Sequence, residues 1–266
     1  MIGGARTDRS AVVRFGGRTD ATHRLICLPY AGGGASVYRD WPAAFPGWLE
    51  IAVLRLPGRE ARIDEPPLPS VPEMVAELVG PLVSLGAAEP AAYSLFGHSL
   101  GAITAFELAR EVRRAGYPAP VHLFVAGRCA PHVRHGVPAI SDLPDPQFLA
   151  AIDAMGGMPV DALAASGLLD LLMPALRADF MAAEGYRYRP GTPLNVPISA
   201  FGGEDDETVS SAQTRAWGEL TTAAFRLRMM PGDHFFLQPQ LAALAAAISG
   251  DIEAGRREGA GQWTPG

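Results

Sequence analysis

Short apolar runs alternate with longer amphipathic segments along most of this chain. The apolar runs end at Gly, Pro or charged residues, as buried strands do, whereas residues 71–85 carry apolar positions at helical spacing. Strands that alternate with helices are typical of a largely parallel sheet flanked by helices. The predicted strands are 11–15, 24–28, 49–56, 91–96, 121–126, 196–201 and 225–230, and the predicted core helices are 37–45, 71–85, 102–114, 209–217 and 238–248.

The alternation is interrupted between residues 141 and 188, where strand signals vanish. We interpret this block as a helical lid inserted over the carboxyl edge of the sheet, where α/β proteins bind ligands. Additional packing for the core is the alternative. Three short helices are predicted within it, at 146–155, 162–172 and 174–183. The chain is thus expected to be one domain over residues 1–266, with its core at about 11–140 and 190–249 and flexible tails at 1–10 and 250–266.

Composition and charge narrow the range of functions. Hydrophobic residues make up 48% of the 266 residues, and the formal net charge of -6 without a long basic run argues against nucleic acid as a partner. We expect neither a membrane span nor a signal peptide, because no apolar stretch has the necessary length. Cys27 and Cys129 lie in apolar runs and are expected to be reduced thiols. Reduced thiols fit a cytoplasmic protein. We further expect a monomer without a metal or other cofactor.

The sequence Gly-His-Ser-Leu-Gly at 97–101 joins a predicted strand to a predicted helix. A serine on such a turn, between glycines that allow the helix to pack closely on the strand, is the nucleophile elbow of the α/β-hydrolase fold. An ordinary glycine-bounded helix start is the alternative. We therefore predict an α/β-hydrolase fold, with a mostly parallel central sheet flanked by helices, and Ser99 as the candidate nucleophile.

A serine hydroxyl needs a base, and in this fold an acid and then a histidine follow the serine along the chain. His234 lies downstream of several acidic residues and just past the last predicted strand, so it is the candidate base. Asp206 is the candidate acid, because residues 203–209 have the spacing Gly-x-x-Asp-x-x-Val; Asp205 is the alternative. We expect His98 to pack locally, and the remaining histidines and acidic neighbours to be structural or solvated.

Three consecutive glycines, at 32–34, follow the predicted strand 24–28. Glycines let a backbone fold sharply and turn its N–H groups toward a ligand. A phosphate-binding loop would also need Lys followed by Ser or Thr, and these are missing. We therefore predict that this loop contributes one N–H group to an oxyanion hole and that Leu100, next to the candidate nucleophile, contributes the second. A flexible turn is the alternative.

Five segments carry a family resemblance. They are Pro-Tyr-Ala-Gly-Gly at 29–33, Leu-Pro-Gly-Arg-Glu-Ala-Arg at 56–62, the elbow at 97–101, the turn at 203–209 and Gly-Asp-His-Phe-Phe at 232–236. Together they resemble the type II thioesterases, the stand-alone editing hydrolases that accompany modular polyketide and nonribosomal peptide synthases. The resemblance runs from Arg24 to Ile248. The family more often has Met where this chain has Leu100, a difference that leaves the backbone amide in place.

The resemblance implies a function. Ser99, Asp206 and His234 would form a catalytic triad, and the amides of Ala31 and Leu100 an oxyanion hole. The substrate would be an acyl group held as a thioester on the phosphopantetheine arm of an acyl or peptidyl carrier protein. A chamber under the lid would select the acyl group, although its candidate residues could equally pack the lid against the core. These candidates are Met155, Met158, Leu168, Leu172 and Phe180.

Three other functions remain open at this stage. A small-molecule carboxylesterase would use the same triad on simple esters. A carrier-protein-binding module would keep the fold with a vestigial triad. An acyltransferase would pass the acyl group to an amine or alcohol in place of water.

Overall fold

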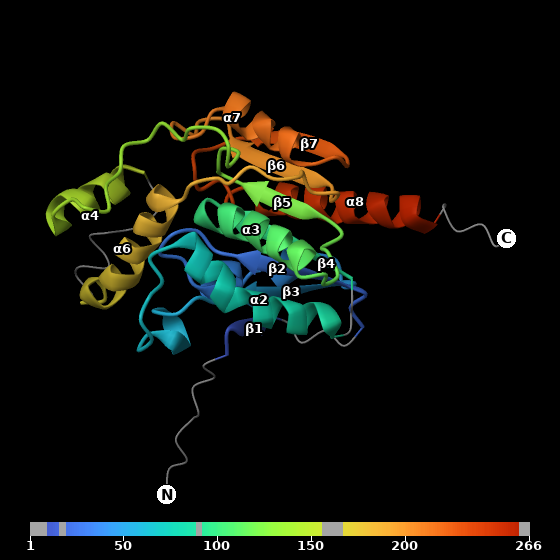
Figure 1. The fold of residues 1–266 in the computed structure, drawn as a ribbon, viewed down its shortest axis with the longest axis horizontal. Coiled ribbons are helices and arrows are strands. Elements are labelled where there is room, and N and C mark those ends of the chain that lie inside the picture. The colour runs from blue at the N-terminus through green and yellow to red at the C-terminus, as the bar shows by residue number, and fades with distance from the viewer. Residues whose placement is uncertain (1–9, 16–19, 89–91, 156–166, 261–266) are drawn as a thin grey trace, which may run out of the picture.

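The computed structural model describes residues 10–15, 20–88, 92–155 and 167–260. Within these ranges seven strands form one sheet, in the order β1-β3-β2-β4-β5-β6-β7 (Figure 1). The strands are β1 (Val12–Phe15), β2 (His23–Leu28), β3 (Leu49–Leu54), β4 (Tyr93–His98), β5 (Leu123–Ala126), β6 (Ile198–Gly203) and β7 (Phe225–Met230). The helices are α1 (Trp41–Ala44), α2 (Val71–Ala87), α3 (Leu100–Arg114), α4 (Asp145–Ala154), α6 (Leu169–Gly185), α7 (Ser211–Arg215) and α8 (Leu241–Ala260). Short 3-10 helices occupy Ala35–Tyr38, Glu60–Arg62 and Ala216–Leu220.

The sheet is mostly parallel, as the sequence predicts. β1 runs antiparallel to β3, and the pairings from β3 through β2, β4, β5 and β6 to β7 are parallel. The strands β2 to β6 are buried along their whole length, as expected where helices cover both faces. Because parallel strands end at the same edge, the loops that follow β2, β4, β5, β6 and β7 gather at the carboxyl edge of the sheet.

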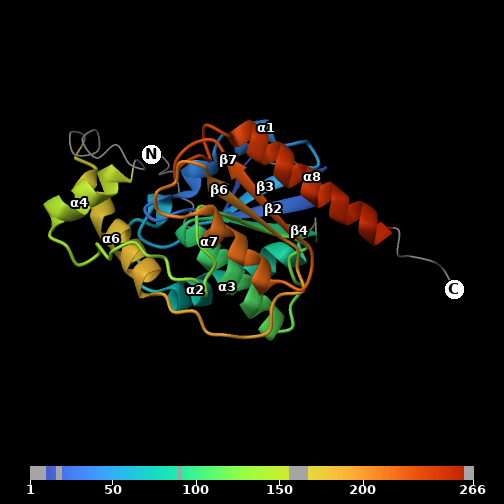
Figure 2. The ribbon, with the colours of Figure 1, turned by 90° about the horizontal axis from the view of Figure 1, so that it is seen from above.

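Two hydrophobic layers hold the helices on the sheet. On one face, α2 and α3 pack through residues such as Leu78 and Phe106, which are buried. On the other face, α1 and α8 pack through residues such as Trp41 and Ile248, which are inaccessible to solvent. Figure 2 shows the two sets of helices on opposite sides of the sheet. Both faces are thus covered, which leaves the carboxyl edge for ligands.

Residues 141–188 lie between β5 and β6 and are called the insertion below. Its helices α4 and α6 lie together beyond the sheet (Figure 1). The predicted break between residues 172 and 174 is wrong, because α6 continues through Pro174. This proline is the sixth residue of the helix, so α6 lacks the one hydrogen bond that would otherwise reach the Asp170 carbonyl and continues beyond it. Residues 156–166, with the start of the predicted helix 162–172, lie outside the described residues. A small cluster joins the insertion helices, formed by Ile140, Phe148, Ile152 and Leu176.

Two other expectations from the sequence are wrong. The predicted helix at 37–45 is a 3-10 helix followed by α1. Pro42 fits only the first turn of an α-helix, so α1 starts at Trp41 instead of continuing from the preceding turn. The predicted tail at 250–266 is helical as far as Ala260, and residues 261–266, like residues 1–9 of the other predicted tail, lie outside the described residues. Asp251 anchors the helical stretch, because its side chain is 5% exposed and pairs with Arg228 of β7 at 2.7 Å.

Two further predictions from the sequence concern the two cysteines and membrane spans. Cys27 and Cys129 are both buried free thiols, as predicted. None of the helices in the described ranges is both long enough and apolar enough to cross a membrane.

Candidate active site

Ser99 lies on the sharp turn between β4 and α3. Its backbone has φ 54° and ψ -114°, a conformation that residues with a side chain rarely adopt and that concentrates at functional sites. The neighbouring glycines are required, because a Cβ atom at Gly97 would overlap the Gly101 carbonyl and one at Gly101 would overlap the Leu28 carbonyl. The Ser99 N–H donates a hydrogen bond to the Ala126 carbonyl at 2.8 Å, which fixes the turn against β5. The arrangement is the predicted strand, turn and helix.

The loops that follow β6 and β7 bring Asp206 and His234 together. His234 Nδ1 lies 2.8 Å from Asp206 Oδ2. The Asp206 side chain is inaccessible and the imidazole of His234 is 13% exposed. The other carboxylate oxygen, Oδ1, accepts hydrogen bonds from the hydroxyl of Thr208 at 2.6 Å and from the N–H groups of Thr208 and Val209 at 2.8 and 3.2 Å. The carboxylate is therefore held on both sides, and it fixes the imidazole ring.

The charge of Asp206 follows from these contacts. Burial alone would raise the pKa of this carboxyl, but hydrogen bonds from His234 and Thr208 outweigh burial and keep the pKa below its ordinary value. A carboxylate that stays ionised at neutral pH accepts the Nδ1 proton of His234 and leaves Nε2 for acid–base chemistry. The alternative acid, Asp205, is exposed, as are Glu204 and Glu207. The structure thus brings Asp206, and not Asp205, to His234.

The glycine loop after β2 forms a tight turn beside the elbow. The Gly33 N–H donates to the Tyr30 carbonyl at 2.9 Å, and Gly32 has φ 76°. A positive φ at the third residue of such a turn is typical of a type II β-turn and favours glycine there. Leu100 is the first residue of α3, so its N–H has no partner within the helix. Ala31 and Leu100, the candidate oxyanion donors, line the same cavity as Ser99 and His234.

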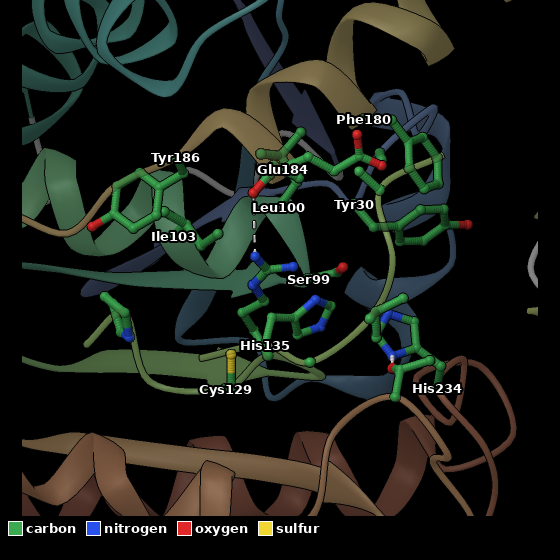
Figure 3. Close-up of a pocket in the computed structure, with 18 of the residues that line it drawn as sticks. Tyr30, Ser99, Leu100, Ile103, Cys129, His135, Phe180, Glu184, Tyr186 and His234 are labelled. Carbon is green, nitrogen blue, oxygen red and sulfur yellow. Dashed lines mark hydrogen bonds between the residues drawn. The ribbon is translucent and has the colours of Figure 1, made fainter. Parts of the chain in front are cut away.

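This cavity has a volume of about 790 Å³ and is bounded by the carboxyl-edge loops and by the insertion. In Figure 3, His135 and His234 lie on one side of Ser99, and Glu184 and Tyr186 lie on the other.

Among the predicted chamber residues, Met155 and Phe180 line the cavity. Leu168 and Leu172 are outside its described lining, and Leu168 is 47% exposed. The reason is position, since α6 reaches the cavity only from Leu176 onward. Met158 lies outside the described residues.

Two histidines beside the cavity differ in how well they were predicted. His98 packs locally, as expected: it is inaccessible, its ring contacts Tyr30, His234 and Phe236, and burial keeps its pKa well below the usual value. His135 was expected to be structural or solvated, but it lines the cavity. Burial, together with the positive charge of Arg128, lowers the pKa of His135 to about 4, so its ring is neutral at pH 7.

Sequence reasoning missed other residues of the site. Tyr30, Glu184 and Tyr186 line the cavity, and Thr208 holds Asp206. The position of Thr208, two residues after an aspartate in a turn, was a signal that could have identified it, because Asp side chains often accept from the backbone two residues on. In the ranges that the structure describes, no group of three His, Cys, Asp or Glu side chains is arranged to hold a metal ion.

Comparisons with known proteins point to one family. A family model described as the thioesterase domain matches residues 23–252. The chain is 42% identical over 217 residues to the gramicidin S biosynthesis protein GrsT of Aneurinibacillus migulanus. This match covers 80% of this chain and 82% of GrsT.

Solved structures agree with this match. RedJ, a thioesterase from the prodiginine pathway of Streptomyces coelicolor, has a TM-score of 0.79 and 35% identity over 86% of this chain and 85% of its own. BorB, a type II thioesterase from the borrelidin cluster, has a TM-score of 0.78 and 34% identity over 90% of this chain and 94% of its own. The predicted α/β-hydrolase fold is confirmed by these relatives and by the sheet. The chain belongs to the thioesterase family, on its type II branch, and is a hydrolase of thioesters.

Proposed function

We propose that this protein uses Ser99, His234 and Asp206 to release acyl groups from the phosphopantetheine arms of carrier proteins in polyketide or nonribosomal peptide biosynthesis. The observation that carries the proposal is the 2.8 Å hydrogen bond between His234 and Asp206 beside a cavity that also contains Ser99. The relatives support the substrate class, because GrsT is named for gramicidin S biosynthesis and BorB belongs to the borrelidin cluster.

The first half of the reaction transfers the acyl group to the enzyme. His234 Nε2 takes the proton of the Ser99 hydroxyl while Oγ attacks the thioester carbonyl carbon. The resulting tetrahedral intermediate collapses, the C–S bond breaks, and His234 returns its proton to the sulfur of the departing thiol. Asp206 stabilises the imidazolium between these two steps. The product is an ester between Ser99 and the acyl group.

The second half regenerates the enzyme. A water molecule enters the position that the thiol has left, His234 takes one of its protons, and the oxygen attacks the Ser99 ester. Collapse of the second tetrahedral intermediate breaks the C–Oγ bond. His234 then gives the proton to Ser99, and the free carboxylic acid leaves.

The amides of Ala31 and Leu100 are the proposed oxyanion hole. Both residues line the cavity beside Ser99, one from the glycine loop and the other from the start of α3. Backbone donors held in advance stabilise the charge that develops on the carbonyl oxygen, and a single donor is commonly worth about 3 kcal/mol in the transition state.

The insertion is the proposed lid, and its cavity face is the proposed acyl chamber. Met155 and Phe180 are the predicted chamber residues that line the cavity, and Leu176 joins them from α6. Apolar side chains at these positions favour an apolar acyl chain over a charged one. The protein is further proposed to act as a cytoplasmic monomer; two buried reduced thiols fit a reducing compartment, and light scattering of the purified protein tests the oligomeric state.

The decisive comparison is between a carrier-bound thioester and a simple ester of the same acid. We expect kcat/KM to be at least about tenfold higher for the acyl-phosphopantetheinyl carrier than for the p-nitrophenyl ester, because the carrier and its arm contribute binding energy that the small ester lacks. The Ser99→Ala variant should lose both activities. Equal or greater kcat/KM for the aryl ester would instead support a carboxylesterase.

Two further results, one from the products of this assay and one from the producing cell, would contradict the proposal. Release of the acyl group as an ester or amide, and not as the free acid, would indicate acyl transfer. A Ser99→Ala variant that retained its biological effect would indicate a carrier-binding module in which the triad has no catalytic role.

A further inference from the structure

A buried ion pair joins the insertion to the core. Arg59 Nη1 lies 2.9 Å from Asp179 Oδ2, and Arg59 Nη2 lies 2.8 Å from Asp179 Oδ1. The side chains are 4% and 0% exposed, respectively. Arg59 belongs to the Leu-Pro-Gly-Arg segment that follows β3, and Asp179 lies in the middle of α6. The pair therefore fixes α6 against the loop after β3 with two parallel hydrogen bonds.

Both members of this pair also hold the glycine loop. Asp179 Oδ2 accepts a hydrogen bond from the Gly32 N–H at 2.7 Å, and Arg59 Nη1 donates to the Gly33 carbonyl at 3.0 Å. Arg59 Nε in addition donates to the Pro57 carbonyl at 3.3 Å. The ion pair is thus bound on one side by the backbone that directly follows Ala31, the proposed oxyanion donor.

The contact with Gly32 selects one orientation of a peptide plane. In a turn closed by a hydrogen bond from Gly33 to Tyr30, the peptide between Ala31 and Gly32 can face either way, which is the difference between type I and type II turns. With the Gly32 N–H directed at Asp179, the turn is type II and Gly32 has φ 76°. A flip of this peptide would reverse its N–H and carbonyl beside the proposed oxyanion hole, and it would also move the Ala31 backbone.

We propose that Arg59 and Asp179 are positioning residues through which α6 sets the geometry of the oxyanion loop. The proposal rests on the function proposed above. It connects the acyl chamber to the catalytic centre, because Phe180, the neighbour of Asp179, lines the cavity. A shift of α6 against the acyl group therefore moves the Asp179 carboxylate, and with it the hydrogen bond to the Gly32 N–H. The ion pair is a route by which the lid and the oxyanion loop act together.

A simpler role, that of attaching the helix to the core, makes different demands. For attachment alone, any well-packed pair of side chains would serve, and an apolar pair of similar volume often replaces a buried ion pair without loss of stability. Orientation of the Gly32 peptide, in contrast, needs an acceptor at the position of Asp179 Oδ2. The two roles can therefore be separated by variants that keep the packing and remove the acceptor.

The test uses two variants of the full-length protein. In Asp179→Asn an amide NH2 group replaces one carboxylate oxygen and the negative charge is lost. Depending on the orientation of the amide, this donor faces either Arg59 Nη2 or the pair formed by the Gly32 N–H and Arg59 Nη1, so the three hydrogen bonds cannot all be kept. In the double variant Arg59→Met with Asp179→Leu, both charges are replaced together, so neither is left buried and unpaired. We measure kcat and KM on an acyl-phosphopantetheinyl carrier, thermal stability, and the fraction of Ser99 that reacts to completion with a fluorophosphonate.

We expect kcat per reactive Ser99 to fall about tenfold in Asp179→Asn and about 100-fold in the double variant, with KM changed less than about threefold. The thermal stability of the double variant should lie close to that of the parent. Asp145→Asn is the matched control: it breaks another ion pair of α6, that of Arg177 with Asp145 at 2.6 Å, on the exposed side of the insertion. Its kcat should equal that of the parent.

Two results would overturn the proposal. One is an unchanged kcat per reactive Ser99 in Asp179→Asn. The other is a double variant whose kcat, like its thermal stability, equals that of the parent. Failure of the proposed function has a different signature, which is already present in the parent protein: the simple ester is hydrolysed at least as well as the carrier thioester, or no free acid is released, whatever the state of residues 59 and 179.

Discussion

The two edges of the parallel sheet carry the same three residue types in different arrangements. At the carboxyl edge, His234 is hydrogen-bonded to Asp206 and lines a cavity with Ser99. Near the amino ends of the strands, Ser199 of β6 lies between the other two types: its hydroxyl donates to Asp251 at 2.7 Å and is 2.9 Å from His122 Nε2.

The order of the hydrogen bonds separates the two clusters. A serine that donates to an aspartate has no proton to give to a histidine, so His122 donates to Ser199 and does not activate it. Ser199 is inaccessible to solvent and His122 is 3% exposed, so no substrate can reach them. Residue types alone therefore do not define a site. The histidine must lie between acid and serine, and the serine must face a cavity.

A second pair at the amino edge repeats the structural arrangement. His23 Nε2 lies 2.9 Å from the hydroxyl of Ser94, and both residues are buried. Burial lowers the pKa of His23 and of His122 to about 4. Both imidazoles are thus neutral at pH 7 and serve as hydrogen-bonding core residues.

The largest expected effect compares the two serines. Ser99→Ala should lower kcat for thioester hydrolysis by at least about 10⁴-fold, since the nucleophile is lost. Ser199→Ala should leave kcat within about twofold and lower the free energy of unfolding by about 1–3 kcal/mol, because buried groups of Asp251 and His122 lose a partner. Steady-state detection of released thiol and urea denaturation measure the two quantities. Equal losses of kcat would remove the distinction between the edges.

Asp206 and Asp251 should differ as the two serines do, one in kcat and the other in the free energy of unfolding. Asp206→Asn should lower kcat by about 10⁴-fold with little change in fold, because the amide favours the wrong tautomer of His234. Asp251→Asn should leave kcat intact and lower the free energy of unfolding by about 2 kcal/mol; the partial exposure of its partner Arg228, 32%, limits the loss. The same two assays decide. A stable but inactive Asp251→Asn variant would contradict the assignment of a structural role.

A smaller loss of activity is expected from the glycine loop. Gly32→Val should lower kcat about 100-fold with KM little changed, because valine disfavours the φ of 76° that the turn adopts beside Ala31. Gly116→Val is the matched control: Gly116 has φ 75° in open space after α3, so this variant carries similar backbone strain far from the cavity. An unchanged kcat in Gly32→Val would refute the oxyanion assignment of the loop.

The smallest effect on activity is expected from the buried histidines, which act on stability through pH. The folded-state pKa of His122 is about 4, below the value of about 6.5 for an unfolded chain, so the unfolded state binds more protons between these pH values. The contribution to stability is therefore complete above pH 6.5 and is lost as pH falls toward 4, by up to about 3 kcal/mol for each such histidine. Urea denaturation at pH 4.5, 5.5 and 7 should reveal this slope. His122→Asn should reduce the slope, and an unaltered slope would contradict the buried neutral state.

Site residues whose role depends on their neighbours in the chain could be predicted from local sequence patterns. The elbow needs only a strand, Ser99 between glycines and a helix, and His234 follows from its place after the last strand. The ion pair of Arg59 with Asp179 joins residues 120 positions apart, and no local pattern relates them. The contact of Ser199 with Asp251, which joins β6 to α8, also depends on tertiary packing. Leu168 lies outside the described lining of the cavity, and the sequence could not show this because the distance of a residue from a cavity depends on where α6 begins.

The role of Ser99 as nucleophile can be tested by identifying the residue that carries the acyl group during turnover. The protein is mixed with an acyl-phosphopantetheinyl carrier, quenched within the first turnover, digested, and analysed by peptide mass spectrometry. We expect the mass of the acyl group to appear on the Ser99 peptide and then to decline as free acid forms. Continued release of free acid without acylation of Ser99, or an acyl group on another residue that turns over at the rate of hydrolysis, would contradict this role.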